Sequence, residues 1–344
     1  MVEKTEFTEE TIKTEVEKHY GMKVDDIKVV NGGSANIYKL TADDGQKYIL
    51  KEFQSKFSGK TILKEINIIN FLRGKGLSVP EYVTCLDRKQ YFEYNDKTVI
   101  IQKFIEGHTQ GNYSGNVEQM LESAKYLGII VNALENYPYD DMFGCNIEKY
   151  TSDEVIDKSI SKHENLIPLV EKNQSHGTEI VKDLKDKIEM LKEVKQDGTF
   201  KKATNVTIKK THGDYNVLQF IYDDNGKIKS IIDFVNAGEM PIVWEIARSY
   251  NYIDKDCKNG EFNIEHLVMY VKEYLKYSKL NKDDLKYLPY VYLVQVLSST
   301  YGYKEYLKNG NLDLLRFGKE RTNICRYLMK NAKTISERLL EIDL

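Results

Sequence analysis

The stretch that decides the fold reads Thr-His-Gly-Asp-Tyr-Asn-Val-Leu-Gln-Phe at residues 211–220 and Ile-Ile-Asp-Phe at residues 231–234. Between these segments, Asp-Asp-Asn-Gly at residues 223–226 is a strong turn signal, and apolar residues flank it on both sides. The pattern predicts a β-hairpin with Asp214 near one end and Asp233 near the other. We therefore expect two carboxylates to lie close together in space.

The length of 344 residues is long for a single hydrophobic core and suits one two-lobed unit or two domains. A content of 41% hydrophobic and 30% charged residues is typical of a soluble globular protein. The formal net charge of -3, with acidic and basic residues interleaved, argues against a nucleic-acid-binding protein. Charge alone therefore indicates no partner.

The 4 cysteines are far apart in the sequence and form no Cys-x-x-Cys pair or Cys/His cluster. This spacing argues against a zinc site and is typical of reduced thiols in the cytosol. Residues 1–10 are acidic and polar, which does not fit a signal peptide, and no apolar run approaches the ~20 residues that span a bilayer. We expect a cytoplasmic protein without a membrane partner.

The N-terminal third alternates in hydrophobicity with a period of two, which predicts short antiparallel strands. The expected strands lie near residues 27–30, 37–41, 47–53, 91–94 and 98–102. Helical patterns occupy residues 8–20, with Thr8 as N-cap, and residues 60–74.

Gly32, Gly33 and Ser34 form a loop of small residues between the first two predicted strands. Such a loop brings backbone N–H groups close to phosphate oxygens, because no side chain holds the ligand away. A Gly-Gly pair in a hairpin is also an ordinary turn, so both interpretations are open at this point.

Lys51 lies on the third predicted strand, and Glu65 lies near the start of the helix that follows. If Lys51 points at nucleotide phosphates, Glu65 is the carboxylate that would orient it. Either residue alone would be a solvated surface residue, and only their order along the chain favours the functional interpretation. A Gly-Lys-Thr sequence at residues 59–61 is not a P-loop, because Gln54 stands where that motif requires glycine.

Residues 102–107 leave the predicted sheet and end in glycine, which indicates a hinge. Here we expect Gln102 and Phe104 beside an adenine ring, with the backbone amides of residues 103–105 available to it.

Beyond Gly107 the hydrophobic period changes to about 3.6, which predicts a helical region. The expected helices lie near residues 117–136, 153–172, 177–195, 264–280, 282–301 and 312–340. We therefore predict an N-terminal nucleotide-binding lobe at residues 1–106 and a C-terminal helical lobe, with the catalytic loop and the substrate site, at residues 107–344.

In this order, the features resemble the aminoglycoside phosphotransferase family, whose small-molecule kinases include choline, homoserine and methylthioribose kinases and spore-coat kinase-like proteins. The resemblance covers nearly the whole chain. It is carried by His-Gly-Asp at residues 212–214, Ile-Asp-Phe at residues 232–234 and the element at residues 237–248. It implies an α+β, protein-kinase-like fold with two lobes, a small antiparallel-sheet N-lobe and a mostly helical C-lobe, and a site in the cleft between them.

The resemblance also implies roles for the matched residues. Asp214 would accept or orient the proton of a substrate hydroxyl, and His212 would pack and hydrogen-bond to hold the catalytic loop. Lys51, supported by Glu65, would hold the α and β phosphates of ATP or GTP.

Two residues depart from the family pattern at the metal site and near it. Mg²⁺ would be held by Asp233 and by Gln219, which stands where the family usually has asparagine. Asn216 is a second amide in the same loop and is the alternative ligand, although spacing favours Gln219. Glu245 replaces the more usual aspartate of the later acidic element.

Three hypotheses about function follow. The first is an active kinase of a small hydroxylated molecule, and the second is a spore-coat-type, nucleotide-binding protein without turnover, motivated by Gln219. Protein kinase activity is disfavoured because no His-Arg-Asp, Asp-Phe-Gly or Ala-Pro-Glu set is present. The acceptor stays open, since an aminoglycoside calls for carboxylates and choline for an aromatic cage, which 25 tyrosines permit without indicating.

Overall fold

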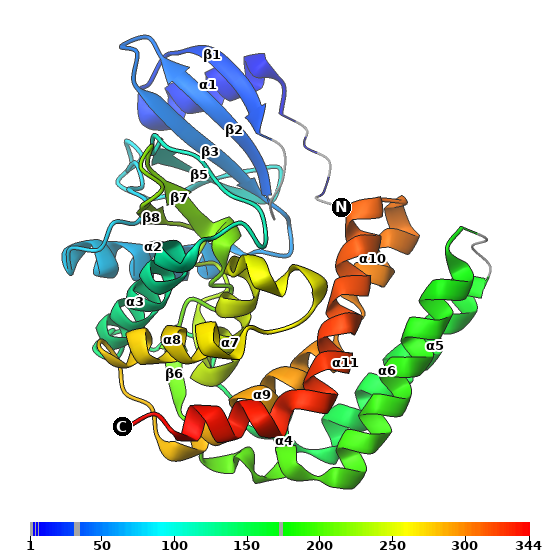
Figure 1. The fold of residues 1–344 in the computed structure, drawn as a ribbon. Coiled ribbons are helices and arrows are strands. Elements are labelled where there is room, and N and C mark those ends of the chain that lie inside the picture. The colour runs from blue at the N-terminus through cyan, green and yellow to red at the C-terminus, as the bar shows by residue number, and fades with distance from the viewer. Residues whose placement is uncertain (1–2, 4, 6, 31–34, 172–174) are drawn as a thin grey trace. The chain divides into compact units, whose positions relative to one another are not determined.

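The N-terminal part of the chain forms a five-stranded antiparallel sheet in the computed structural model (Figure 1). The structure describes residues 3, 5, 7–30, 35–171 and 175–344. The sheet order is β1-β2-β3-β5-β4. Its strands are β1 (Val24–Val30), β2 (Ala35–Ala42), β3 (Lys47–Phe53), β4 (Phe92–Tyr94) and β5 (Lys97–Lys103).

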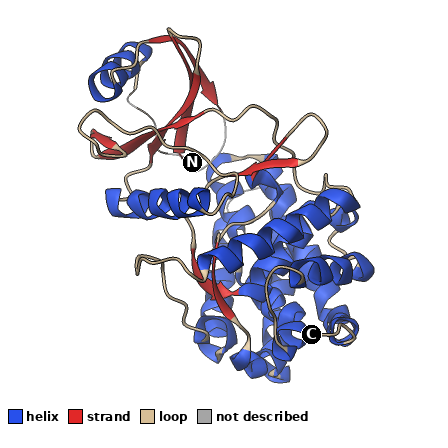
Figure 2. Cartoon of the chain, turned by 90° about the vertical axis from the view of Figure 1, so that its left-hand side faces the viewer, coloured by secondary structure: helices blue, strands red, loops and turns tan. Residues whose placement is uncertain are grey.

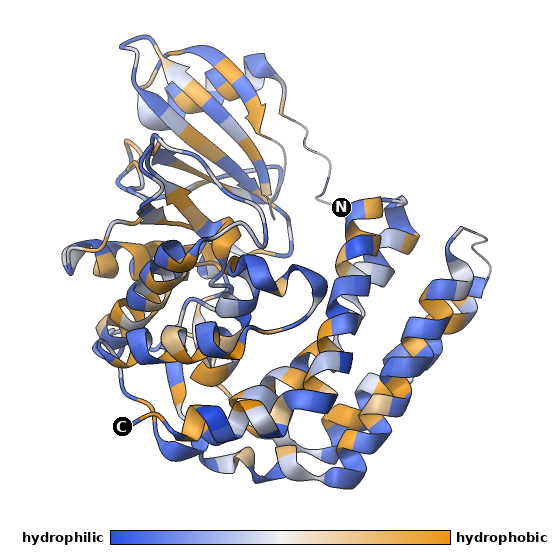
Figure 3. Cartoon of the chain, in the orientation of Figure 1, coloured by the Kyte–Doolittle hydropathy of each residue, from blue (hydrophilic) through white to orange (hydrophobic). Residues whose placement is uncertain are grey.

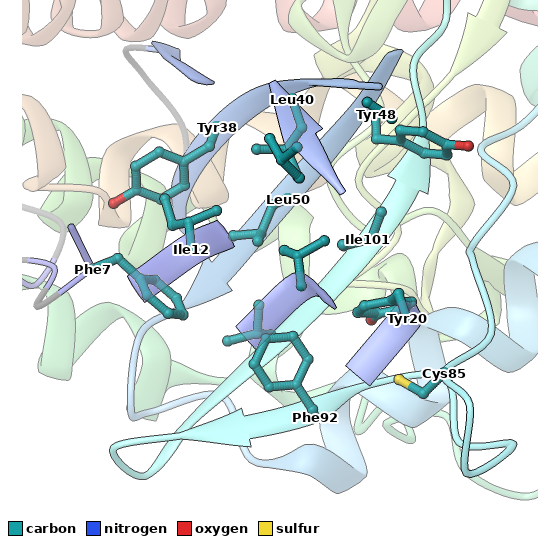
Figure 4. Packing of buried hydrophobic residues seen from close by; sticks show 14 residues of the cluster. Phe7, Ile12, Tyr20, Tyr38, Leu40, Tyr48, Leu50, Cys85, Phe92 and Ile101 are labelled. Atoms are coloured by element: carbon teal, nitrogen blue, oxygen red, sulfur yellow. The ribbon is translucent and has the colours of Figure 1, made fainter. Parts of the chain in front are cut away.

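One face of this sheet packs on helix α1 (Glu9–Tyr20), which begins at Thr8, whose hydroxyl accepts a hydrogen bond from the Thr11 N–H at 3.1 Å. Leu50 of β3 belongs to the hydrophobic cluster on this face (Figure 4). Lys51 follows Leu50 on the same strand, and successive side chains point to opposite faces of a sheet. Lys51 therefore faces away from this cluster, and it is 7% exposed.

The same compact unit contains helix α2 (Gly59–Gly74) and the hairpin of β7 (Phe220–Tyr222) and β8 (Ile228–Ile231). Tyr222 pairs with His108 in the segment after β5. A Cβ at Gly107, where φ is 151°, would lie 2.4 Å from the Tyr222 carbonyl oxygen, so only glycine allows this close approach. This first unit comprises Met1–Thr109, Tyr137–Met142 and Gln219–Ala237.

The strands of the hairpin are shorter than the pattern of residues 211–233 predicts. Asn216 Oδ1 accepts a hydrogen bond from the Leu218 N–H at 3.0 Å, and a 3-10 turn follows at Val217–Gln219. A side chain that binds the nearby backbone competes with strand pairing, so only the last residues before the turn join β7. Before this loop, β6 (Ile208–Thr211) pairs instead with β9 (Gly238–Pro241), a second β feature that the sequence did not predict.

The second unit, which comprises Gln110–Asn136, Phe143–Leu218 and Gly238–Leu344, is mainly helical (Figure 2). Its longer helices are α3 (Val117–Leu134), α5 (Asp153–Glu171), α6 (Gly177–Asp197), α7 (Ile242–Ile253), α8 (Ile264–Leu275), α9 (Lys282–Ser298), α10 (Tyr301–Asn309) and α11 (Leu312–Leu340). Short helical segments are α4 (Glu148–Thr151), η1 (Thr199–Asn205) and η3 (Lys255–Asn259).

These elements confirm the predicted α+β class, with a small antiparallel sheet followed by a helical region. Helices α7 and α10 were not predicted from the sequence. The division into lobes at residue 106 stays a proposal. Within the part of the chain that the structure describes, no helix combines the length and the apolar character needed to cross a membrane.

Helices α5 and α6 pack side by side, each with an apolar stripe along a polar helix (Figure 3). The buried His163 of α5 donates from Nδ1 to the Ser159 carbonyl at 2.7 Å, since a carbonyl only accepts. Its Nε2 is buried without a hydrogen-bond partner among the described residues. Burial lowers the pKa of His163 to about 4, and the charge of Lys187 acts in the same direction.

We expect this histidine to make the fold acid-sensitive. The native state binds the proton more weakly than the unfolded chain, whose histidine pKa is about 6.5, so the unfolding free energy falls as the pH falls from about 6.5 to about 4. The loss at pH 5 is roughly 2 kcal/mol. Urea unfolding at pH 7 and pH 5 would measure it, and His163→Leu should show a smaller difference. An equal pH dependence in that variant and in His176→Gln, an exposed control, would contradict the assignment.

Candidate active site

In the first unit, the structure brings together Lys51 on β3, Glu65 on α2 and Asp233, which follows β8. Glu65 is fully buried, and burial raises the pKa of its carboxyl. The charge of Lys51 lowers that pKa and the charge of Asp233 raises it, so both groups lie near Glu65. No hydrogen bond joins Glu65 to Lys51 in the described residues, while the Tyr82 hydroxyl and the Phe234 backbone lie close to the Glu65 carboxyl and lower its pKa. The predicted Lys51–Glu65 pair is therefore near but not closed by a hydrogen bond.

The loop that carries Asp233 is held by a lysine that the sequence analysis missed. Asp233 has a left-handed backbone, with φ at 67°, which is uncommon outside glycine. Lys64 donates hydrogen bonds to the carbonyls of Val235 at 3.0 Å and Ala237 at 2.8 Å. Lys64 is 3% exposed, and burial lowers its pKa to about 8. The sequence pattern indicates its neighbour Glu65 as a site residue but gives no signal for Lys64, because nothing in the sequence links Lys64 to a loop 171 residues later.

Gln219, the other predicted metal ligand, lies across the hairpin from Ile232, the residue before Asp233. The Ile232 N–H donates to the Gln219 carbonyl at 3.0 Å, and Phe220 pairs with Ile231. Gln219 and Asp233 thus stand at the same end of the β7–β8 pair, with both side chains partly exposed.

At the predicted hinge, the structure corrects the expected set of backbone donors. The Lys103 N–H donates to the Glu81 carbonyl at 2.8 Å, and the Phe104 N–H donates to the Lys47 carbonyl at 3.0 Å. Both amides are used within the unit and are not available to an adenine ring, which leaves the N–H of Ile105 as the predicted donor.

The two predicted side chains of the hinge, Gln102 and Phe104, lie in the first unit. The buried Gln102 has an Oε1 atom without a partner among the described residues. Phe104 is half-buried, with Lys39 Nζ 3.9 Å from the centre of its ring. The predicted phosphate loop of Gly32, Gly33 and Ser34 lies outside the described residues.

Asp214 lies in the second unit, on a loop held by its own neighbours. Gly213 has φ at 81°, a left-handed conformation that favours glycine. The Asp214 N–H donates to His212 Nδ1 at 3.3 Å, so the fully buried His212 contacts the loop backbone. Asn216 Nδ2 donates to the Asp214 carbonyl at 2.7 Å and reaches Asp214 Oδ1 at 3.4 Å.

The fully buried Glu245 of α7 binds this loop through both of its carboxylate oxygens. One of its oxygens accepts from the Tyr215 N–H at 3.0 Å, and the other accepts from the Thr211 hydroxyl. A buried carboxylate is costly unless such donors satisfy it, so Glu245 and the Asp214 loop stabilise each other. The longer Glu side chain, which replaces aspartate at this position, thus still reaches the loop.

A cavity of about 450 Å³ opens beside Asp214 within the second unit. Residues that line it include Asp214, Trp244, Arg248, Tyr252, Phe317 and Arg321. Arg248 Nη2 forms an ion pair with Asp214 Oδ1. The two arginines escaped the sequence analysis. Arg248 stood at the end of the matched acidic element without an assigned role, and no sequence signal connects Arg321 of α11 to Asp214.

Comparison with solved structures finds the same fold in small-molecule phosphotransferases. An amicoumacin kinase in complex with AMP-PNP, Ca²⁺ and amicoumacin shares 16% identity over 98% of this chain and 96% of its own, with a TM-score of 0.63. Spectinomycin phosphotransferase in complex with ADP and spectinomycin shares 13% identity over 96% and 99%, with a TM-score of 0.65. A microcompartment-associated aminopropanol kinase shares 14% identity over 96% and 100%, with a TM-score of 0.59.

No family model and no curated protein sequence matches this chain. At identities of 13–16%, the likeness to these structures shows the fold alone. The protein-kinase-like fold implied by the sequence resemblance is thereby confirmed, and the chain covers nearly the full length of these structures.

The support of the Asp214 loop by Glu245 can be tested by stability. Glu245→Ala removes an acceptor from two donors, Tyr215 N–H and the Thr211 hydroxyl, and leaves a cavity, so we expect a loss of roughly 3 kcal/mol in unfolding free energy. Glu245→Gln keeps one acceptor oxygen and the volume, and should lose less than half as much. Urea unfolding of both variants measures the difference, and equal losses would show that the hydrogen bonds contribute little.

Proposed function

We propose that this protein is a phosphotransferase that moves the γ-phosphoryl group of ATP or GTP to a hydroxyl group of a small molecule in the presence of Mg²⁺. The observation that carries the proposal is the group formed by the buried Lys51 and Glu65 with the partly exposed Asp233 in the first unit. Nucleotide-bound phosphotransferases with the same fold support it.

The donor set of the hairpin fits a magnesium ion. Mg²⁺ prefers carboxylate and amide oxygens, which Asp233 and Gln219 supply at the same end of β7 and β8. The Asn216 oxygen already accepts from the Leu218 N–H, which favours Gln219 over Asn216 as the amide ligand. When bound, the ion would neutralise charge on the nucleotide phosphates.

The buried Glu65 carboxyl lies near enough to Lys51 for the lysine charge to lower its pKa, which fits a lysine that Glu65 orients toward a bound nucleotide. Lys51, oriented by Glu65, would bind phosphate oxygens, and Gln102, Phe104 and the Ile105 N–H would face the base. The Gly32–Gly33–Ser34 loop would cover the phosphates, as proposed from the sequence.

Asp214 would orient the acceptor hydroxyl and take its proton as the new O–P bond forms. The bond between the γ-phosphorus and its bridging oxygen breaks in the same step, and the nucleoside diphosphate leaves. His212 holds the loop rather than reacting, because its Nδ1 is engaged by the Asp214 N–H. Asp214 Oδ1 contacts both Arg248 and Asn216, which gives the carboxylate a defined orientation.

Turnover should depend on Asp214. We expect Asp214→Asn to lower kcat at least about 100-fold on an identified acceptor, because an amide cannot take the proton. Nucleotide binding should persist, since the proposed nucleotide residues lie in the other unit. Steady-state kinetics with release of nucleoside diphosphate as the readout would check this, and unchanged turnover would remove Asp214 from the reaction.

Nucleotide binding should depend on the metal residue. In the wild type, Mg²⁺ with a non-hydrolysable ATP or GTP analogue should raise Tm, and the shift should grow with ligand concentration. Asp233→Asn should lose most of the Mg²⁺-dependent part of the shift, whereas Gln219→Asn should keep it. If the wild type shows no shift with either nucleotide, the nucleotide site is refuted, and binding without turnover on any acceptor would identify a nucleotide-binding protein that does not catalyse transfer.

A further inference from the structure

The charges around Asp214 have the wrong sign for a cationic acceptor. Two guanidinium groups, Arg248 and Arg321, line the cavity together with the single carboxylate of Asp214. A site for a polyamine or an aminoglycoside needs an excess of carboxylates to offset the charge of its ligand. Among the residues that line the cavity the excess charge is positive, although the whole chain has a net charge of -3.

Arg321 is the stronger indicator, because it is 6% exposed and forms no ion pair with a carboxylate in the described residues. Its Nη1 donates to the Tyr292 hydroxyl at 3.2 Å, and its Nη2 donates to the Tyr113 hydroxyl. Its Nε is buried without a partner among the described residues. A buried charge whose hydrogen bonds go only to neutral hydroxyl groups is costly, and an anion in the cavity would offset that cost.

Arg248 adds a second guanidinium group to the lining of the same cavity. One of its nitrogens pairs with Asp214, while Nη1 is buried and has no partner among the described residues. Both arginines contact the Tyr252 ring, whose centre lies 4.9 Å from Cζ of Arg248 and 4.6 Å from Cζ of Arg321. The two guanidinium groups are therefore gathered around one ring.

The same contacts argue against a quaternary ammonium acceptor. An aromatic cage binds a cation through open ring faces. Here Arg248 lies 5.4 Å from the centre of the Trp244 ring, and Arg321 lies 5.1 Å from the centre of the Phe317 ring. The protein's own cations already use these rings, so a choline-like molecule would meet repulsion.

A second, wider cavity of about 1090 Å³ shares Ser299 and Tyr301 with the first. Lys162 of α5 and Lys304 of α10 line it, and neither forms an ion pair in the described residues. Its one lining carboxylate, Glu305, is paired with Lys308 at 2.7 Å. The positive charge thus continues from the small cavity into the wide one.

From these contacts we propose that the acceptor is a hydroxyl compound that carries a carboxylate or phosphate group, bound by Arg321 and Arg248, with a flat or apolar part against the Tyr252 and Phe317 rings. That the bound anion is a phosphoryl acceptor rests on the proposed function. The anion site itself rests only on the residues of the cavity. The arginine fork matches the paired oxygens of either anion.

A matched set of probes tests this proposal. Benzyl alcohol, 4-(hydroxymethyl)benzoate and 4-(hydroxymethyl)benzylamine share one ring and one hydroxyl and differ in charge. Calorimetric titration without nucleotide should show the benzoate binding about tenfold or more tightly than the alcohol, with the amine weakest. The preference should weaken at high ionic strength. Equal or tighter binding of the alcohol or the amine would overturn the proposal.

Variants locate the preference. Arg321→Gln should reduce the benzoate preference about tenfold, and Arg321→Lys should keep part of it because it keeps a charge without the fork. Lys333→Gln on the same helix removes an exposed charge and should leave the preference unchanged. A nucleotide-induced Tm shift shows that each variant is folded, and an unchanged preference in folded Arg321→Gln would contradict the assignment.

Turnover is measured separately with the same three alcohols, by release of nucleoside diphosphate in the presence of Mg²⁺. Tight benzoate binding without transfer to any acceptor would count against the proposed function and leave the anion site standing. Transfer to the amine in preference to the benzoate would support a kinase and refute the anionic acceptor.

Discussion

A buried charge must be satisfied by polar groups, and three loops of this protein are held by side chains under that constraint. Lys64 binds the carbonyls that follow Asp233, and Glu245 binds donors on both sides of Asp214. Lys187 of α6 binds the carbonyls of Val296 at 2.9 Å and Ser299 at 2.7 Å at the end of α9. Each of these side chains is at most 3% exposed, and each forms hydrogen bonds with backbone groups or a hydroxyl.

A hydrogen bond from a buried charged side chain to the backbone stabilises the fold and also fixes the position of the loop. A backbone carbonyl cannot swing away as a surface carboxylate can, so the lysines fix the chain where the proposed ligands or cavity walls begin. The arginines of the cavity differ, because Arg321 binds tyrosine hydroxyls and leaves one nitrogen without a partner in the described residues. Some buried charged side chains of this protein therefore hold loops through hydrogen bonds to the backbone. Others, such as Arg321, keep a donor nitrogen without a partner in the described residues and are suited to bind a ligand.

The fold was largely predictable from local patterns, because helix and strand periods repeat over many residues. Helix α11 has the bounds that its spacing predicts, and α1 begins at the expected cap, Thr8. The short strand β6 was not predicted because its partner β9 is distant in sequence. The loop of Asn216 was misread as strand, since an amide side chain that binds the backbone leaves no periodic signal.

The candidate site divides along the same line. Asp214, Asp233, Lys51 and Glu65 belong to motifs with order and spacing, so a sequence can indicate them. Lys64, Arg248 and Arg321 act through contacts that only the folded chain creates, and charged residues of these types are common on any surface. The proposed acceptor class rests on Arg248 and Arg321, which explains why the sequence left it open.

The first unit is assembled from three separate segments of the chain, and its last segment carries Gln219 and Asp233. A fragment ending at residue 106 would lack β7 and β8, and it would leave the Lys64 ammonium without the Val235 and Ala237 carbonyls. The first unit is therefore complete only when all three segments are present, because the Lys64 side chain of one segment holds the loop of another.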